Sequence, residues 1–297
     1  MRKFYGQFEP PVDRFISERY FPEDGIRGVF VECGAYDGLT ECSCKFFEES
    51  MGWTGYNFEP VPWIFDKLSI NRPLSKNLNF ALSNVDGEAN FKAVDHPQFG
   101  TNCTNGSLTH TSEHTKWLEE EGCAFVDVTV KLRTWRDFVV QENVAHVDLL
   151  VLDVEGHELS VIDGMKGSSV LPDVICIEVG HLKFDEIRQR LASFGYVYDI
   201  SSHVNAFFVK ADRLALFAHR RARAADVVAR PDVDVAMVEL IDVVQHRLVF
   251  RESECERLQE EVNSLRGHVS SLNGLLHEIT QSKAWKFVEF VRKFRRA

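Results

Sequence analysis

The sequence lacks long apolar runs and any pattern typical of an export signal. No stretch of its 297 residues approaches the ~18 uncharged apolar residues that a membrane-spanning helix needs. The first residues, MRKFYGQFEPPVDRF, contain no apolar core of about 7–15 residues, which a secretory signal would require. We therefore expect a cytoplasmic protein without a spanning helix.

Cysteine pairs at metal-binding spacing are also lacking. The seven cysteines are an odd number, and without an export signal they do not indicate a disulfide framework. Cys42 and Cys44 form a C-x-C pair, but no second pair follows at the spacing of a zinc site. Cys33 and Cys176 lie in apolar runs and are interpreted as buried small side chains. Structural zinc is therefore not expected.

Positive charge is scarce over most of the chain. The formal net charge is -11, and an acidic protein does not attract nucleic acid through its overall field, so we expect no nucleic-acid partner. The charge is nevertheless uneven. Residues 213–229 hold four arginines and one aspartate, and residues 280–297 hold six basic side chains and one glutamate. Such a basic end is suited to an anionic surface.

Short β-rich runs alternate with helical patterns through the first part of the chain. The alternation predicts an α/β domain over residues 1–212, with a mostly parallel sheet covered on both faces. Strands are expected at 28–33, 53–58, 77–82, 86–93, 124–132, 147–153 and 174–179, with a closing antiparallel pair at 196–200 and 204–210; helices are expected at 40–50, 62–71, from 158 and at 183–194.

Ligands of such sheets bind beyond the carboxyl ends of the strands. The segment 95–115 is polar and aperiodic, so we expect a long loop that acts as a lid or as an acceptor-binding element. Several polar residues follow the predicted strands, and they are the first candidates for chemistry: Glu32, Asp37, Glu59, Ser83, Asp153, Glu155, His157, Glu178 and His181.

The first strand lacks the G-x-G-x-x-G motif of a nicotinamide site. It is followed by Gly-Ala-Tyr-Asp-Gly at residues 34–38, with Glu32 two residues before the first glycine. A carboxylate there suits a cofactor that presents amine and hydroxyl donors. Glu59, at the end of the second strand, is placed to accept hydrogen bonds from a ribose diol. Together these features favour an adenosyl cofactor without a pyrophosphate, namely S-adenosylmethionine.

Several sequence blocks resemble the FkbM family of S-adenosylmethionine-dependent methyltransferases. The most specific is D-V-E-G-H-E at residues 153–158, and others are F-V-E-C-G-A-Y-D-G at 30–38 and Y-N-F-E-P at 56–60. The match covers about residues 4–210. The resemblance implies a Rossmann-like class I methyltransferase fold with a mostly parallel seven-stranded sheet, and O-methyl transfer to a sugar or polyketide hydroxyl.

The resemblance also implies a cofactor site. The turn after the first strand should surround the methionine and ribose, Glu59 should hold the ribose hydroxyls, and Ala81 and Leu82 should lie near the adenine. Tyr36 stands where the family commonly has Asn. The expected cofactor-binding residues are Glu32, Gly34, Ala35, Tyr36, Asp37, Gly38, Glu59, Pro60, Ala81, Leu82 and Asp153.

Methyl transfer to a hydroxyl needs alignment of the two reacting groups and a base for the hydroxyl proton. Asp153, Glu155 and His157 cluster after one strand and are the catalytic candidates, with His157 or Asp153 as the base. The alternative for His157 is a structural role at the start of a helix. Asp153, Glu178 and His181 offer ligands to a divalent cation, but no metal is expected.

After residue 230 the sequence changes its period. Apolar residues recur at spacings of four and three, which predicts a coiled coil at 234–280 after a basic linker at 213–233. The pairs Val262/Leu265 and Val269/Leu272 place valine at a and leucine at d, which favours a parallel homodimer through residues 237–279. A helix packed back on the domain is the alternative. Residues 281–297 predict a basic amphipathic helix for a membrane surface or a partner groove.

These features together predict an O-methyltransferase acting on a glycan or a small hydroxylated acceptor. We expect its place to be surface polysaccharide or glycolipid synthesis, peripherally at the inner face of the cytoplasmic membrane. The first alternative is a small-molecule or polyketide O-methyltransferase. The second is a coiled-coil assembly protein whose methyltransferase domain is degenerate.

Overall fold

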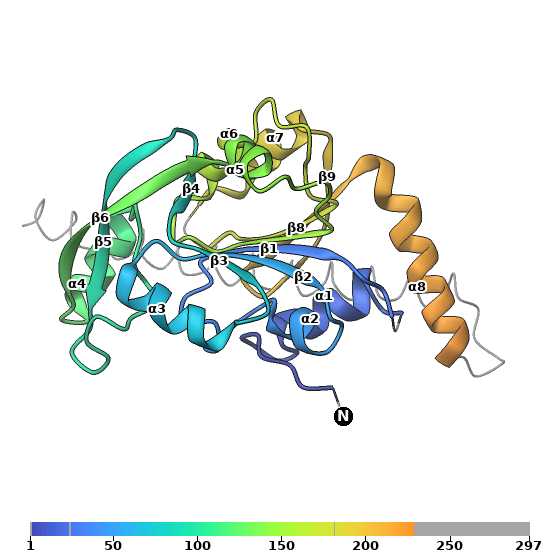
Figure 1. Ribbon diagram of the computed structural model, residues 1–297, viewed down its shortest axis with the longest axis horizontal. Helices are drawn as coiled ribbons and strands as arrows, with labels where there is room; N and C mark the ends of the chain where they lie inside the picture. Colours follow the sequence, from blue (N-terminus) through green and yellow to red (C-terminus); the bar gives the residue numbers. More distant parts are fainter. Residues whose placement is uncertain (1, 24, 181, 229–297) are drawn as a thin grey trace, which may run out of the picture. The chain divides into compact units, whose positions relative to one another are not determined.

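The computed structural model describes residues 2–23, 25–180 and 182–228, which Figure 1 shows as coloured ribbon. They fall within one compact unit that ends at residue 235. The predicted coiled coil at 234–280, the amphipathic helix at 281–297 and His181 lie outside the described residues. No described helix is both long enough and apolar enough to cross a membrane.

A seven-stranded sheet forms the centre of the unit (Figure 1). Its strand order is β3-β2-β1-β7-β8-β10-β9, and only β10 runs against its neighbours, which confirms the predicted mostly parallel sheet and its closing antiparallel pair. The strands are β1 (Val29–Cys33), β2 (Thr54–Phe58), β3 (Lys76–Leu78), β7 (Leu149–Leu152), β8 (Val174–Glu178), β9 (Tyr196–Ser202) and β10 (Asn205–Lys210).

Helices cover both faces of this sheet because its central strands are apolar on both sides. On one face, Val31 and Leu150 pack in a core with α5 (Trp135–Gln141), α6 (Glu158–Gly164) and α7 (Phe184–Ser193). On the other face, Phe30 and Val151 pack with α1 (Val12–Tyr20), α2 (Lys45–Glu49) and α8 (Leu214–Val228). Alternate residues of each strand therefore supply two separate cores.

A second, three-stranded sheet is inserted between β3 and β7. It comprises β4 (Ala81–Ser83), β5 (Gly87–Asp95) and β6 (Ala124–Thr134) in the order β4-β6-β5, and α4 (Ser112–Glu120) lies between β5 and β6 in the chain. Its apolar side packs on Val61 and Ile64 at the start of α3 (Pro62–Asn71). The insertion therefore stands beside the carboxyl end of β2.

The prediction of a single strand at 77–82 is wrong, because the chain passes there from the seven-stranded sheet to the three-stranded sheet. Residues 79 and 80 separate β3 from β4. The side-chain amide of Asn79 donates to the carbonyls of Glu59 and Pro60 at 2.9 and 3.1 Å, which fixes the change of direction at the end of β2.

Residues 213–233 were predicted to form a basic linker, but residues 214–228 form the helix α8. Phe217 is buried between Tyr20 and Phe21 of the α1 region, and the Arg220 guanidinium stacks on Phe21. Leucine, alanine and arginine are strong helix formers, so this composition favours a helix as readily as a linker.

Candidate active site

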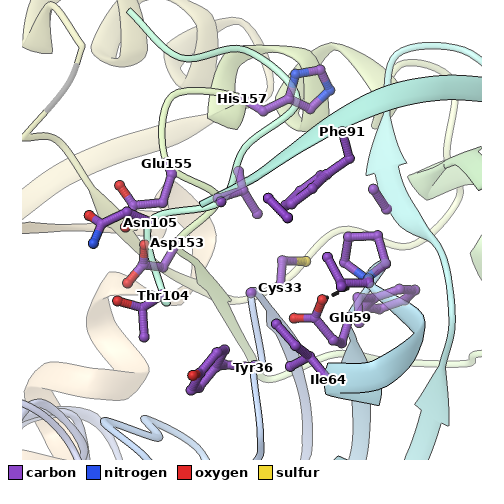
Figure 2. A pocket seen from close by; sticks show the side chains of 18 of the residues that line it. Cys33, Tyr36, Glu59, Ile64, Phe91, Thr104, Asn105, Asp153, Glu155 and His157 are labelled. Atoms are coloured by element: carbon purple, nitrogen blue, oxygen red, sulfur yellow. Dashed lines mark hydrogen bonds between the residues drawn. The ribbon is translucent and has the colours of Figure 1, made fainter. Parts of the chain in front are cut away.

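A cavity of about 340 Å³ opens at the carboxyl ends of β1, β2, β7 and β8 (Figure 2). The structure brings most of the predicted site residues together there: Gly34, Tyr36, Glu59, Pro60, Ala81, Leu82, Asp153, Glu155, His157 and Glu178 line its wall. Their strands lie side by side in the sheet, so residues up to 144 positions apart in the sequence meet at one edge.

The turn after β1 passes directly against the end of β7. Gly34 has φ +83°, and a Cβ at this position would lie 1.8 Å from the Asp153 carbonyl oxygen. Only glycine allows both this left-handed backbone and this approach. The Ala35 amide donates to the Phe58 carbonyl at 3.1 Å, and the Asp153 amide donates to the Cys33 carbonyl at 3.2 Å. Backbone bonds therefore hold the ends of β2, β1 and β7 in fixed positions.

Glu32 does not line the cavity, contrary to the expectation that it contacts the cofactor. Its buried carboxylate accepts from the amides of Ser43 and Cys44 at 2.8 and 3.0 Å, and pairs with the Arg72 guanidinium at 3.0 Å. Arg72 is itself fully buried and also pairs with Glu48 at 2.5 Å. Glu32 therefore anchors the loop that follows β1.

Three further expected contacts, Ala35, Asp37 and Gly38, lie behind the cavity wall rather than in it. The Asp37 carboxylate accepts from the Leu39 and Thr40 amides at 2.9 and 2.8 Å and closes the turn locally. Gly38 packs so closely on Arg72 that a Cβ would lie 2.5 Å from its Cγ. These residues shape the turn, whose inner surface is formed by Gly34 and Tyr36.

Glu59 is buried at the end of β2 with its carboxyl group turned toward the cavity (Figure 2). The Val61 amide donates to its Oε1 at 2.8 Å. Burial raises the pKa of Glu59 to about 8, because the apolar surroundings disfavour the charged form more than the backbone donors favour it. A ligand hydroxyl that donates to this carboxyl would satisfy the buried charge.

The carboxylates of Asp153, Glu155 and Glu178 form a cluster on the side of Gly34 that is opposite Glu59. Their oxygens lie within 4.8 Å of one another. Loss of solvation, followed by repulsion from Glu155 and Glu158, raises the pKa of Asp153 well above its usual range, and burial and Asp153 do the same for Glu178. Asp153 and Glu178 also share a hydrogen bond, so the pair titrates as a unit that holds a proton.

His157 is held away from this carboxylate group, at the upper side of the cavity in Figure 2. Its Nε2 lies 3.0 Å from Ser83 Oγ and its Nδ1 lies 3.0 Å from Thr109 Oγ1. Burial lowers the pKa of His157 to about 4, so the ring is neutral near pH 7. Since both ring nitrogens are engaged, His157 ties the end of β4 to the long loop before α4.

Glu158 explains the shape of the turn between Asp153 and α6. Its buried Oε1 accepts from the amides of Val154 and Gly156 at 3.0 and 3.2 Å. Gly156 has φ +103°, and a Cβ there would lie 2.6 Å from the Thr109 carbonyl oxygen. The conspicuous D-V-E-G-H-E block thus combines cavity carboxylates with residues that fold the turn presenting them.

The rest of the cavity wall comes from the long loop before α4 and from residues that were not predicted to line the site. The long loop supplies part of it, as expected for a lid or acceptor-binding element, although α4 begins inside the predicted loop at Ser112. Gln7 and Glu41 also line the cavity but were not predicted, because nothing in the sequence besides their polarity indicates that they lie near the strand ends. The lining residues outside the predicted set include Gln7, Thr40, Glu41, Phe91, Ala93, Thr101, Thr104, Asn105 and Leu108.

Residues 32–198 match the family model described as the methyltransferase FkbM domain. This match covers more than half of the 297-residue chain and includes every described element that lines the cavity except the segment around Gln7. The chain belongs to the FkbM methyltransferase domain family. The earlier resemblance is therefore confirmed for this part of the chain.

Solved structures similar to this FkbM domain have low identity. Methyltransferase FkbM from Methylobacillus flagellatus is 12% identical, with 62% of this chain and 44% of that chain covered and a TM-score of 0.37. A TehB-like SAM-dependent methyltransferase from Corynebacterium glutamicum is 12% identical, with coverages of 67% and 86% and a TM-score of 0.34. TrmK of M. capricolum in complex with S-adenosylhomocysteine is 6% identical, with coverages of 83% and 97% and a TM-score of 0.38. No curated protein matches the chain.

The residues of this FkbM domain fit S-adenosylmethionine. The Gly34 backbone lines the cavity at a position where no side chain can stand, and Glu59 offers buried acceptor atoms one strand away. Asp153, Glu155 and Glu178 supply the negative charge that suits a sulfonium and an ammonium group. These three carboxylates could also bind a cation that prefers oxygen ligands. Two of them, Asp153 and Glu178, are among the predicted metal candidates.

Proposed function

We propose that the protein is an S-adenosylmethionine-dependent O-methyltransferase that methylates a sugar hydroxyl in surface polysaccharide or glycolipid biosynthesis. One observation carries the proposal. The cavity of this FkbM domain places Glu59 on one side of the Gly34 turn and the Asp153–Glu178 pair on the other, along one edge of the sheet. This arrangement separates a ribose-binding end from a proton-accepting end.

Bound cofactor supplies an activated methyl group, so the chain has to orient the acceptor, exclude water and accept one proton. Asp153 is the base we assign, because its side chain is open to the cavity and a raised pKa suits proton transfer near neutral pH. The hydroxyl proton goes to a carboxylate oxygen of Asp153, and Glu178 stabilises the protonated pair through their shared hydrogen bond. His157 is less suited, since Ser83 and Thr109 occupy its ring nitrogens.

The loop before α4 supports an acceptor with several polar groups. Thr104 and Asn105 stand next to Asp153 and Glu155 in Figure 2 and offer hydroxyl and amide groups for hydrogen bonds. Phe91 forms an apolar wall on the opposite side. Polar side chains of this kind, presented by a loop over a carboxylate base, suit a sugar ring better than an apolar polyketide.

The last part of the chain supports a location near lipid-linked glycans. The heptad repeat at 237–279 supports a parallel homodimer, and the six basic side chains within 281–297 support contact with an anionic membrane surface. Two such ends in one dimer would act together and strengthen a weak contact. The location we propose is therefore peripheral, at the inner face of the cytoplasmic membrane.

Analysis of the methylated product tests this function. The full chain is incubated with methyl-labelled S-adenosylmethionine and a glycolipid and polysaccharide extract of the producing cells. Acid hydrolysis followed by mass spectrometry should then yield labelled O-methyl monosaccharides. Label in small apolar metabolites alone would favour the small-molecule alternative, whereas absence of cofactor binding at millimolar concentration would favour the assembly protein.

A further inference from the structure

Backbone strain is concentrated around the cavity. Six non-glycine residues in the described part of the chain have positive φ, a conformation that side chains disfavour. Tyr36, Glu41 and Glu155, with φ of 48°, 51° and 54°, line the cavity. Phe8 and His203, with φ of 77° and 53°, contact each other beside it. Strained residues cluster at active sites and at segments that hold ligands. The proposed function gives no role to Phe8 or His203.

Phe8 belongs to a short segment, residues 5–9, that we call the strap. The fully buried Asp13 carboxylate accepts from the amides of Tyr5 and Gly6 at 2.7 and 3.2 Å and ties the strap to α1. Gly6 lies so close to α1 that a Cβ would be 2.9 Å from the Val12 amide nitrogen. The Tyr5 hydroxyl donates to Glu49 of α2. The start of the strap is therefore fixed to two helices.

The strap continues from these helices across the sheet edge. Gln7 lines the cavity, and its Nε2 donates to Glu41 Oε1 at 3.1 Å. Phe8 stacks on His203 with ring centroids 4.5 Å apart and an interplanar angle of 8°. His203 lies in the β9–β10 turn, which is joined to β8 where the Val179 amide donates to the Val204 carbonyl at 2.9 Å. The strap thus links the loop after β1 to the turn beside β8.

The end of β7 lies between those two points in the strand order, and it carries Asp153. The strap therefore borders the Asp153–Glu178 end of the cavity, away from Glu59. In the described part of the chain, the side-chain amide of Gln7 has a second N–H and an Oε1 without a partner. One donor and one acceptor on a single planar group match the hydroxyls of a sugar.

We propose that the strap walls the acceptor end of the cavity, with Gln7 binding an acceptor hydroxyl and the Phe8–His203 stack holding the strap closed over bound ligand. The inference rests on the proposed function for the identity of the acceptor. The closure of the strap is independent of that identity, because it applies to any ligand in the cavity.

Dissociation of S-adenosylhomocysteine tests the closure without an acceptor. Stopped-flow displacement is measured on the full chain carrying no N-terminal tag, because the strap begins at residue 5. Phe8→Ala and His203→Ala should each raise the dissociation rate about tenfold, and the double variant should add little because the two rings act as one unit. Leu74→Ala, which truncates an exposed apolar side chain elsewhere, should leave the rate unchanged. Wild-type rates in both single variants would overturn the closure.

Methyl transfer to the glycan extract tests Gln7. At saturating S-adenosylmethionine, Gln7→Ala should lower kcat/KM for the extract about tenfold or more, while kcat changes little and S-adenosylhomocysteine affinity stays at the wild-type value. Gln141→Ala, an exposed glutamine on α5, is the matched control. Equal values for both variants, or an equal loss of S-adenosylhomocysteine affinity and transfer in Gln7→Ala, would overturn this role. If the wild-type protein labels no glycan, the proposed function fails, and the dissociation rates still decide whether the strap closes.

Discussion

The cavity carboxylates differ in their surroundings, and this difference assigns them different roles. Glu59 is enclosed by apolar residues, backbone donors and the β2 end, whereas Asp153 and Glu178 face each other and further carboxylates. Glu32 is buried as deeply but is neutralised by Arg72. The isolated acid suits a ligand that donates hydrogen bonds, the coupled pair suits proton transfer, and the paired acid holds the loop.

Cofactor binding should depend on the protonation of Glu59. Its pKa of about 8 in the cavity means that the carboxyl is largely protonated at pH 7, and ribose hydroxyls that donate to it favour the ionised form. Binding should therefore release a proton, and affinity should fall as the pH is lowered below 8. Glu59→Gln should weaken binding about 10–100-fold, since a hydrogen bond to a charged group contributes ~1.5–3 kcal/mol, and should abolish the pH dependence.

Calorimetry with S-adenosylhomocysteine in buffers of different ionisation enthalpy measures that proton directly. Asp137→Asn is a suitable control, because this half-buried carboxylate on α5 lies outside the cavity. An affinity that is flat between pH 6 and 9 in the wild-type protein would contradict the assignment of Glu59.

Asp153→Asn should abolish the base while leaving the shape of the cavity intact. We expect kcat to fall by about 10²–10⁴, which is more than the loss of S-adenosylhomocysteine affinity, because Glu155 and Glu178 remain to face the ammonium group. Because the carboxyl pKa is raised and the base must be ionised, wild-type kcat/KM should rise with pH through a midpoint well above the ~4 of a free aspartate. The same midpoint should persist in His157→Gln, whereas its loss in that variant would identify His157 as the base.

The role of Glu32 could not be predicted from the sequence. Its place at the end of β1 followed from the pattern of the strand, but its partner Arg72 lies 40 residues away at the end of α3. A carboxylate at a strand end looks the same in sequence whether it faces a ligand or a buried guanidinium. Glu59, which lacks a described cation partner, kept its predicted place in the cavity.

The turns at the ends of the strands hold the cavity in shape, and the turn after β1 is the most constrained of them. Gly34→Ala should combine a strained left-handed backbone with a contact that backbone atoms cannot relieve. Gly195→Ala is a matched control, because Gly195 has φ +84° but no atom within 4 Å of its Cβ position.

Chemical denaturation and calorimetry distinguish these two variants. Gly195→Ala should lower the free energy of unfolding by about 1–2 kcal/mol, because alanine disfavours the left-handed backbone there. Its S-adenosylhomocysteine affinity should stay at the wild-type value. Gly34→Ala should lower the free energy of unfolding by more than this and lose cofactor binding. Equal losses of stability, with binding retained in both variants, would show that the approach of Gly34 to Asp153 is unimportant.

Much of the arrangement of elements was predictable from the sequence. Strands β1, β7 and β8 are apolar runs, and the observed bounds of these strands and of β2 lie within one or two residues of the predicted ones. The helices α1, α4 and α5 were not predicted, because most of their stability comes from packing their apolar faces against parts of the chain that are distant in sequence. The division between β3 and β4 was missed because it depends on Asn79 contacting the end of β2.

The whole molecule joins an acidic catalytic domain to a heptad segment and a basic end. We expect the full chain to be a dimer and a chain ending at residue 236 to be a monomer that retains S-adenosylhomocysteine binding. Analytical ultracentrifugation at several concentrations measures both states. A dimeric truncated chain would place the dimer interface in the catalytic domain instead.

We propose that this cavity transfers methyl groups to glycan hydroxyls. The most direct measurement is incorporation of labelled methyl from S-adenosylmethionine into the glycan extract by the wild-type chain, with Asp153→Asn and Glu59→Ala measured alongside. We predict labelled O-methyl sugar from the wild-type chain and at least about 100-fold less from Asp153→Asn, with Glu59→Ala impaired through weak cofactor binding. Equal labelling by all three proteins would show that Asp153 and Glu59 lack the roles assigned to them. No glycan labelled by the wild-type chain would contradict methyl transfer to glycans.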